Sequence, residues 1–351
     1  MSDPAPPFFI LGSHGSGSTL LRLMLDSHER LAVPPETGFM RLVTAHTWVP
    51  YWELGAGWHE RLGLTAGDLD RELGAFYGGL FRRYAEQRGK QRWGEKTPFH
   101  VWHVAEIRRL FPDAVFVAIV RHPLGSVGSM LRRFDKNIDK ATAHWLGSTR
   151  EVVHQATTGD LPLCLLRYED LARDPEGVLR ELLDWLGEPW SAQVLEHHRV
   201  QRDAPKEVEG GTRPGEAVDA ARIERWRKWF GEDERRAVLD ATRGWAALLG
   251  YGDDPSAEPA RLAGGGRRYV ATAAELTARR PSYPDLDATP PRRPAVDEPI
   301  LPRGRRSRRR ALRRAQGASG QAARDVFRRL PPGLQRGVRE ARRHRRRRDG
   351  D

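Results

Sequence analysis

The chain has 351 residues, 39% of them hydrophobic and 30% charged, which is enough to bury a core without disulfide bonds or structural metal. The single cysteine, Cys164, excludes an internal disulfide framework and a cysteine-based zinc or iron–sulfur site. The longest apolar run, residues 114–120, is much shorter than the about 20 residues of a membrane-spanning helix, and the first residues lack the pattern of a secretory leader. We therefore expect neither secretion nor a membrane span.

The net charge of +12 is unevenly distributed along the chain. Residues 255–351 contain 26 Arg, no Lys and 10 acidic residues, a net charge of +16. The preceding 254 residues carry 33 basic and 37 acidic groups, a net charge of −4, and all 11 Trp. The basic character therefore belongs to the C-terminal segment, and it gives no reason to expect that the folded part binds nucleic acid.

Short apolar runs alternate with helical patterns in the first half of the chain, which is typical of a parallel α/β sheet. Strands are predicted at residues 8–11, 115–120 and 161–166. The first strand is followed by a Gly/Ser-rich loop, residues 12–17, and by a helix over 19–25. A helix before the second strand has apolar residues at helical spacing: Val101, Val104, Ile107 and Phe111. After the third strand, Pro175 suits the first turn of a helix that ends near Gly187.

The remaining segments define the expected organisation. Residues 38–92 are interpreted as a helical insertion, and the polar, Gly/Pro-rich residues 200–218 as a mobile loop. Two helices, 220–230 and 233–249, end at Gly250. From about residue 253 the pattern changes to Pro, Gly and Arg, so we expect one domain over residues 1–252 and a largely disordered, Arg-rich tail over 253–351.

The loop between the first strand and its helix has the composition of an anion-binding site. Its small residues let backbone N–H groups converge on an anion, to which the helix N-terminus adds its positive dipole end. The spacing from Gly12 to Thr19 is that of a nucleotide P-loop, except that Ser18 stands where the lysine is expected. A tight Gly-rich turn without a ligand is the alternative interpretation.

The second predicted strand ends in Arg121, and Ser129 follows eight residues later near the start of a helix. A kinase or nucleotide hydrolase normally has an acid there to hold Mg²⁺. A guanidinium instead grips a phosphate with two hydrogen bonds. The alternative is an arginine paired with a surface carboxylate, but both strands place anion-binding groups at the same edge of a parallel sheet.

Five segments together resemble the PAPS-dependent sulfotransferases, above all the bacterial and tyrosylprotein branch. They are FFILGSHGSGSTLLRLMLDSHE, VPPET, GEKTP, PDAVFVAIVRHPLGSVGSM and LLRYEDLARDP, within residues 7–251. The resemblance implies a P-loop-like three-layer α/β fold whose central parallel sheet is flanked by helices. It also implies transfer of a sulfuryl group from 3′-phosphoadenylyl sulfate (PAPS) to a hydroxyl or amine, with release of PAP and without a metal.

The resemblance also implies roles for individual residues. The loop would hold the 5′-phosphosulfate of the donor, Arg121 and Ser129 the 3′-phosphate, and Tyr168 would line the nucleotide site. Glu36 would be the general base toward the acceptor, and Lys96 would lie near the transferring group. The loop residues concerned are Gly15, Ser16, Gly17, Ser18 and Thr19.

One departure from the family pattern keeps alternatives open. The family usually has Arg or Lys where this chain has Gly15, so a positive charge expected beside the phosphosulfate is missing. His14 and Arg22 are the candidates to replace this charge. Gly15 favours a catalytically weak nucleotide-binding adaptor tethered by its basic tail. A P-loop kinase or NTPase is a further alternative, although Ser18 and Arg121 argue against it. The alternative interpretation of Glu36, which the neighbouring motifs disfavour, is an N-cap or a surface acid, and that of Lys96 is a solvated loop lysine.

The remaining features concern metals, acceptor and location. His100 and His103 lie three positions apart, but no third ligand is placed by spacing, so a metal site is not expected. The aromatic residues of 48–58 line an acceptor pocket or form the core of a lid. The acceptor class is a small molecule, lipid or glycan, and the tail either binds an anionic membrane surface or is simply solvated. The expected location is the cytoplasm, with a peripheral position at the inner membrane surface as the alternative that the tail leaves open; the sequence does not indicate an oligomeric state.

Overall fold

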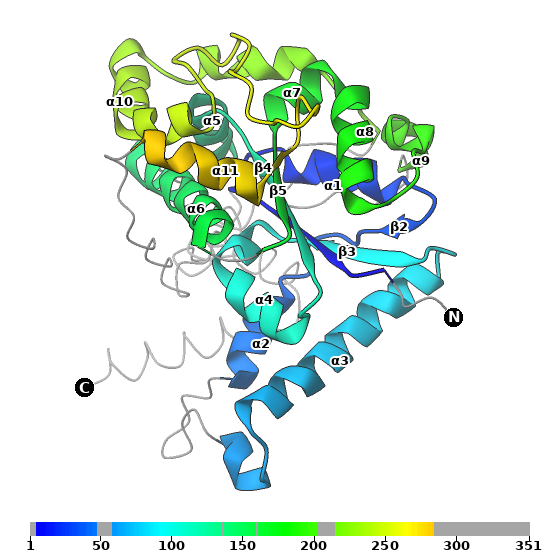
Figure 1. The fold of residues 1–351 in the computed structure, drawn as a ribbon. Coiled ribbons are helices and arrows are strands. Elements are labelled where there is room, and N and C mark those ends of the chain that lie inside the picture. Colours follow the sequence, from blue (N-terminus) through cyan, green and yellow to red (C-terminus); the bar gives the residue numbers. More distant parts are fainter. Residues whose placement is uncertain (1–4, 48–57, 135–136, 159–160, 202–214, 284–351) are drawn as a thin grey trace, which may run out of the picture. The chain divides into compact units, whose positions relative to one another are not determined.

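The computed structural model describes residues 5–47, 58–134, 137–158, 161–201 and 215–283 (Figure 1). Nearly all of them belong to one compact unit within Met1–Arg132 and Lys136–Ala295, to which the description below refers. In these ranges, no helix combines the length and the apolar character needed to cross a membrane. The part described leaves out residues 202–214 of the loop predicted over 200–218, the side chains of Trp48, Tyr51, Trp52 and Trp58, and residues 284–351 of the tail.

Strands of the described residues form a six-stranded sheet in the order β2-β3-β1-β4-β5-β6. All neighbours are parallel except β6, which runs antiparallel to β5. The predicted strands are confirmed as β1, β4 and β5, which are almost completely buried. The bounds are β1 Phe8–Leu11, β2 Leu31–Ala32, β3 Arg92–Lys96, β4 Val115–Val120, β5 Leu163–Arg167 and β6 Ala271–Thr272.

Helices cover both faces of this sheet, because successive strand residues point to opposite sides. Phe8 and Ile10 pack toward α1 and α8 in one apolar core. Phe9 faces the opposite side, where it meets rings of Phe39 and Phe111. The α-helices are α1 Ser18–Asp26, α2 Phe39–Thr47, α3 Ala66–Glu86, α4 Val104–Leu110, α5 Pro123–Arg133, α6 Ile138–Thr158, α7 Tyr168–Arg173, α8 Pro175–Leu186, α9 His197–Val200, α10 Glu232–Leu248 and α11 Ala273–Arg279. The 3₁₀ segments are η1 Trp58–Leu62, η2 Pro98–His103, η3 Ala192–Val194, η4 Ala220–Lys228 and η5 Arg280–Ser282.

The segment expected as a helical insertion, 38–92, does contain α2 and α3, but it leads directly into a strand that the sequence analysis does not predict. This strand, β3, is polar in sequence and yet completely buried. Arg92 is satisfied there by the carbonyl groups of Pro6 and Leu186 and by Glu188. The GEKTP motif therefore lies at a strand end in the middle of the fold.

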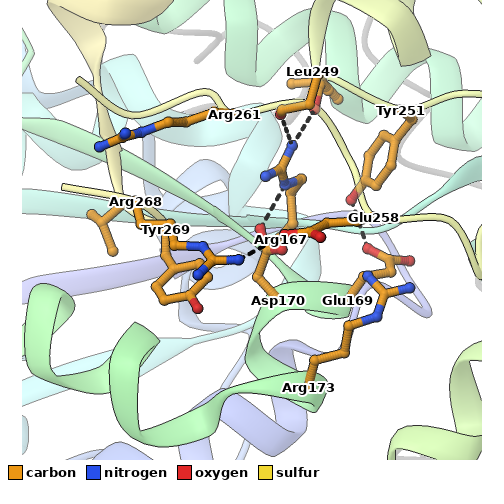
Figure 2. Close-up of polar contacts among 12 residues, drawn as sticks. Arg167, Glu169, Asp170, Arg173, Leu249, Tyr251, Glu258, Arg261, Arg268 and Tyr269 are labelled. Atoms are coloured by element: carbon orange, nitrogen blue, oxygen red, sulfur yellow. Dashed lines mark hydrogen bonds and ion pairs between the residues drawn. The ribbon is translucent and has the colours of Figure 1, made fainter.

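The sequence analysis expects the folded domain to end at residue 252, but the structure continues the fold beyond this residue. Arg167 of β5 donates to the carbonyl oxygens of Leu249 and Ala260, at 3.2 and 2.6 Å, and pairs with Asp170. The Tyr251 hydroxyl donates to Glu169 at 2.7 Å, in the same network (Figure 2). Beyond it, β6 pairs with β5, and α11 packs beside α6 (Figure 1). The expected domain boundary at residue 252 is therefore wrong. The segment after it has a weak apolar pattern, but polar contacts with β5 and its neighbours hold it in the fold.

Candidate functional site

The loop over residues 12–17 joins β1 to α1 and packs tightly against two other helices. Gly15 and Gly17 have φ values of +83° and +95°, which favour glycine. A Cβ on Gly15 would lie 2.9 Å from the carbonyl oxygen of Ser126, and one on Gly17 would lie 2.3 Å from the Tyr168 ring. The loop therefore exposes backbone rather than side chains at these two points.

The loop and the start of α1 have the features of an anion cradle. Gly17 is the N-cap of α1 and provides no side-chain cap, so the first N–H groups of this helix have no such partner. The hydroxyl of Ser16 is buried and has no hydrogen-bond partner within the described residues. Ser18 and Thr19 form the first turn of the helix. The predicted loop residues thus share one small region.

Arg121 follows β4 and reaches the same loop. Its guanidinium donates to the carbonyl oxygens of Gly15, at 3.3 Å, and Arg222, at 3.0 Å. It also lies 4.2 Å from the centre of the Tyr168 ring. Ser129 of α5 adjoins Gly15, where an added Cβ would lie 3.2 Å from its hydroxyl. The structure therefore brings Arg121, Ser129 and Tyr168 together beside the loop.

Glu36 and Lys96 form an ion pair at the other side of the loop. The Lys96 side chain is completely buried, and it also donates to the Thr19 hydroxyl at 3.2 Å. The Glu36 side chain retains 18% exposure, so it is not fully enclosed. One ammonium thus links the start of α1 to the predicted base.

The candidates to replace the charge missing at Gly15 have other contacts. Arg22 donates to the carbonyl oxygen of Val33 at 3.1 Å and faces Asp26. The His14 ring lies 5.0 Å from the His144 ring, and the two ring planes are tilted by 33°. In the described part of the chain, no group of three or more His, Cys, Asp or Glu is arranged to hold a metal ion.

Two buried carboxylates near the site are not identified by the sequence analysis. Glu95 pairs with His100, with Oε2 and Nδ1 2.6 Å apart. Glu169 accepts hydrogen bonds from the backbone N–H of His122 and the hydroxyl of Tyr251, and burial raises its pKa although the Arg121 charge opposes the shift. In the sequence, only one feature points to Glu95 and Glu169: each lies inside a family motif, next to Lys96 and Tyr168 respectively.

Comparisons with known proteins show the family to which this sequence is similar. The family model described as "Sulfotransferase family" matches residues 6–192, more than half of the chain. The chain is 28% identical over 274 residues to protein-tyrosine sulfotransferase 1 of Danio rerio, covering 72% of this chain and 74% of that protein. A putative protein-tyrosine sulfotransferase of Caenorhabditis briggsae is 24% identical over 72% of this chain and 90% of its own length.

Solved structures show the same fold. The sulfotransferase domain from the Synechococcus PCC 7002 olefin synthase matches 72% of this chain and 98% of its own, with 25% identity and a TM-score of 0.52. The sulfotransferase domain from the curacin biosynthetic pathway matches 71% and 99%, with 22% identity and a TM-score of 0.50. The predicted P-loop-like α/β fold, with a mostly parallel sheet between helices, is confirmed.

Proposed function

Because the chain belongs to the sulfotransferase family and is an enzyme that transfers sulfuryl groups, we propose that its donor is PAPS and its product PAP. The observation that carries the proposal is the meeting of three groups at one loop. The Gly/Ser cradle lies between Arg121 with Ser129 on one side and the Glu36–Lys96 pair on the other.

The residues present fit such a donor. The N–H groups at the start of α1 and the buried Ser16 hydroxyl would hold the 5′-phosphosulfate. Arg121 and Ser129 would hold the 3′-phosphate, with Tyr168 beside them. When bound, PAPS supplies an activated sulfuryl group on a phosphate leaving group.

Glu36 and Lys96 have different roles in the transfer step. Glu36 takes the proton of the acceptor hydroxyl or amine, since its side chain is not fully enclosed and is held on a segment with two prolines. Lys96 holds Glu36 in place and supplies positive charge beside Thr19, where negative charge develops during transfer. No metal takes part in this scheme.

The donor assignment is tested by thermal unfolding of the full chain with PAP, 5′-AMP or ADP, each with and without Mg²⁺. PAP at about 100 times its Kd stabilises the protein by about 2.7 kcal/mol, more than 5′-AMP does and independently of Mg²⁺. Arg121→Ala weakens PAP binding by about 2 kcal/mol, because the 3′-phosphate loses a charged donor.

The control for Arg121→Ala is Arg180→Ala, which removes an exposed arginine that pairs with Glu176 on α8 and lies over the ring of Trp190. It leaves PAP binding unchanged. Stabilisation by ADP with Mg²⁺ equal to that by PAP would contradict the donor assignment and favour a nucleotide hydrolase.

The role of Glu36 is tested by Glu36→Gln. Loss of the base lowers kcat by about 10²- to 10⁴-fold, while PAP binding is retained because the donor-binding groups are untouched. Steady-state transfer assays and PAP titration measure the two quantities, with the exposed Glu176→Gln as control. Full activity of Glu36→Gln would rule out this carboxylate as the base.

We further propose that the acceptor is a hydroxyl- or amine-bearing small molecule, lipid or glycan, handled in the cytoplasm at an anionic membrane surface. The arginine blocks of residues 303–348 support attraction to acidic headgroups. Relatives named protein-tyrosine sulfotransferases make a tyrosine side chain the competing acceptor. Sedimentation of the full chain with phosphatidylserine vesicles, compared with neutral vesicles, tests the surface.

A further inference from the structure

Glu95 is the residue before Lys96 at the end of β3, and it is 0% exposed. An ionised carboxylate is costly to bury unless hydrogen bonds and an opposite charge compensate. Its Oε1 accepts from the Thr37 hydroxyl at 2.7 Å, the Thr37 backbone N–H at 3.3 Å and the Thr97 hydroxyl at 2.8 Å. Two of these three donors belong to the residue after Glu36.

The second oxygen of Glu95 lies 2.6 Å from Nδ1 of His100, a residue that is also 0% exposed; the two atoms are close enough for an ion pair but do not have hydrogen-bond geometry. Burial alone would raise the pKa of Glu95, but the His100 charge and the hydrogen bonds of Thr37 and Thr97 hold it below its ordinary value. The His100 ring meets Phe39, the first residue of α2, edge-on at 5.0 Å. The Glu95–His100 pair therefore joins the end of β3 to the Thr37–Phe39 turn, because Glu95 contacts Thr37 and His100 contacts Phe39.

The segment that carries Glu36 is fixed at two points. At its start, the backbone N–H of Val33 donates to Asp26 at 2.8 Å, and the Val33 carbonyl accepts from Arg22. At its end, Thr37 is bound by Glu95, and the Gly38 N–H donates to the Thr97 hydroxyl at 3.1 Å. Glu36 stands between these points, and its carboxylate meets the lysine that follows Glu95.

We propose that Glu95 is a positioning residue for sulfuryl transfer, which holds the backbone of Glu36 through Thr37 and sets it opposite Lys96. This inference rests on the proposed role of Glu36 as the base. A displacement of about 1 Å at a reacting group is enough to lower a rate by about 10²-fold. The carboxylate acts on the position of Glu36, and it takes no proton from the acceptor.

The experiment compares Glu95→Ala and Glu95→Gln with the wild-type full chain. Glu95→Ala lowers kcat by about 10²-fold, while the KM for PAPS and the Kd for PAP stay unchanged, because the phosphate loop and Arg121 are not touched. Glu95→Gln restores most of kcat, since its amide oxygen still accepts from Thr37 and Thr97. Hydrogen exchange of the Gly38 and Phe39 amides is faster in Glu95→Ala than in the wild type.

A milder variant keeps the test decisive if Glu95→Ala does not fold. Thr37→Val removes one donor of an exposed residue, and it also lowers kcat without changing PAP affinity. The matched control is Thr242→Val, which removes a buried hydroxyl that bonds within α10. This control leaves kcat and the exchange of the Gly38 and Phe39 amides as they are in the wild type.

The outcomes separate this inference from the proposed function. An active wild type, an inactive Glu36→Gln and a fully active Glu95→Ala would overturn the positioning role alone. Loss of PAP binding in parallel with kcat in Glu95→Ala would reduce Glu95 to a general stability role and overturn it as well. A fully active Glu36→Gln would instead overturn the assignment of the base.

Discussion

Gly15 has a left-handed backbone conformation, and the space beside it is filled by α5. An added Cβ would lie 2.9 Å from the Ser126 carbonyl oxygen and 3.0 Å from the Ser129 Cβ. The packing of this loop therefore leaves no room at position 15 for the basic side chain that is usual in the family. Restoring arginine at this position would disturb the residues that are proposed to hold the 3′-phosphate.

Gly15→Ala is expected to destabilise the fold by at least about 1–2 kcal/mol, the typical cost of a left-handed conformation for a residue with a Cβ. The matched control is Gly79→Ala in α3, where the new methyl group meets no atom within 4 Å. Because alanine is a better helix former, this control stabilises the protein by about 0.5–1 kcal/mol. Urea unfolding measures both changes. Equal stabilisation by the two variants would contradict the account of the loop.

At the scale of elements, Glu181 of α8 holds the entry to β6. Its carboxylate accepts from the backbone N–H groups of Arg268, Tyr269 and Val270, at 2.7, 2.8 and 2.9 Å. Glu181→Ala leaves three donors without this partner and is expected to cost about 1–3 kcal/mol. Glu176→Ala on the same helix removes only an exposed pair with Arg180 and costs less than about 1 kcal/mol. Similar costs in chemical denaturation would show that β6 is not anchored there.

The sequence predicts the longer apolar strands, and it misses the polar strand β3 and the two-residue strands β2 and β6. The apolar runs of β1, β4 and β5 are each sufficient evidence of burial. In contrast, β3 is buried because Arg92, Glu95 and Lys96 find partners far along the chain, and no local pattern reports such partners. Strand β6 has only two residues, too few for any periodicity.

The candidate site divides in the same way. The phosphate loop and Arg121 follow from motifs at strand ends, since parallel strands bring those ends to one edge. The pairing of Glu36 with Lys96 joins positions 60 residues apart, and the support by Glu95 depends on a buried histidine. Such contacts depend on how side chains pack in three dimensions, and the spacing of motifs along the sequence does not predict that packing.

For the whole molecule, two buried histidines make stability depend on pH. Burial lowers the pKa of His122 and of His197 to about 4, from an ordinary value of 6.5. Between these values the unfolded chain binds more protons than the folded one, so stability is complete above about pH 6.5 and is lost as the pH falls toward 4. Each histidine accounts for up to about 3 kcal/mol of this loss.

His122→Asn is expected to flatten this dependence, because asparagine does not titrate and its side-chain oxygen can replace the ring nitrogen that accepts from Leu124. Unfolding free energies at pH 7.5 and 4.5 measure the slope. Gln91→Asn, at an exposed position, is the control; it removes no titrating group and keeps the wild-type slope. An unchanged slope in His122→Asn would mean that this imidazole is protonated in the folded state.

The place of β6 at the edge of the sheet also has a consequence in time. Cys164 of β5 pairs with Thr272, so the two partners are 108 residues apart. At a synthesis rate of about 5–20 residues per second, the outer edge of β5 waits about 5–20 s for its neighbour. An unpaired strand edge is a template for pairing with other chains. Nascent chains that have emerged beyond residue 167 but not yet to residue 271 therefore expose this edge of β5 to pairing with other chains on the ribosome.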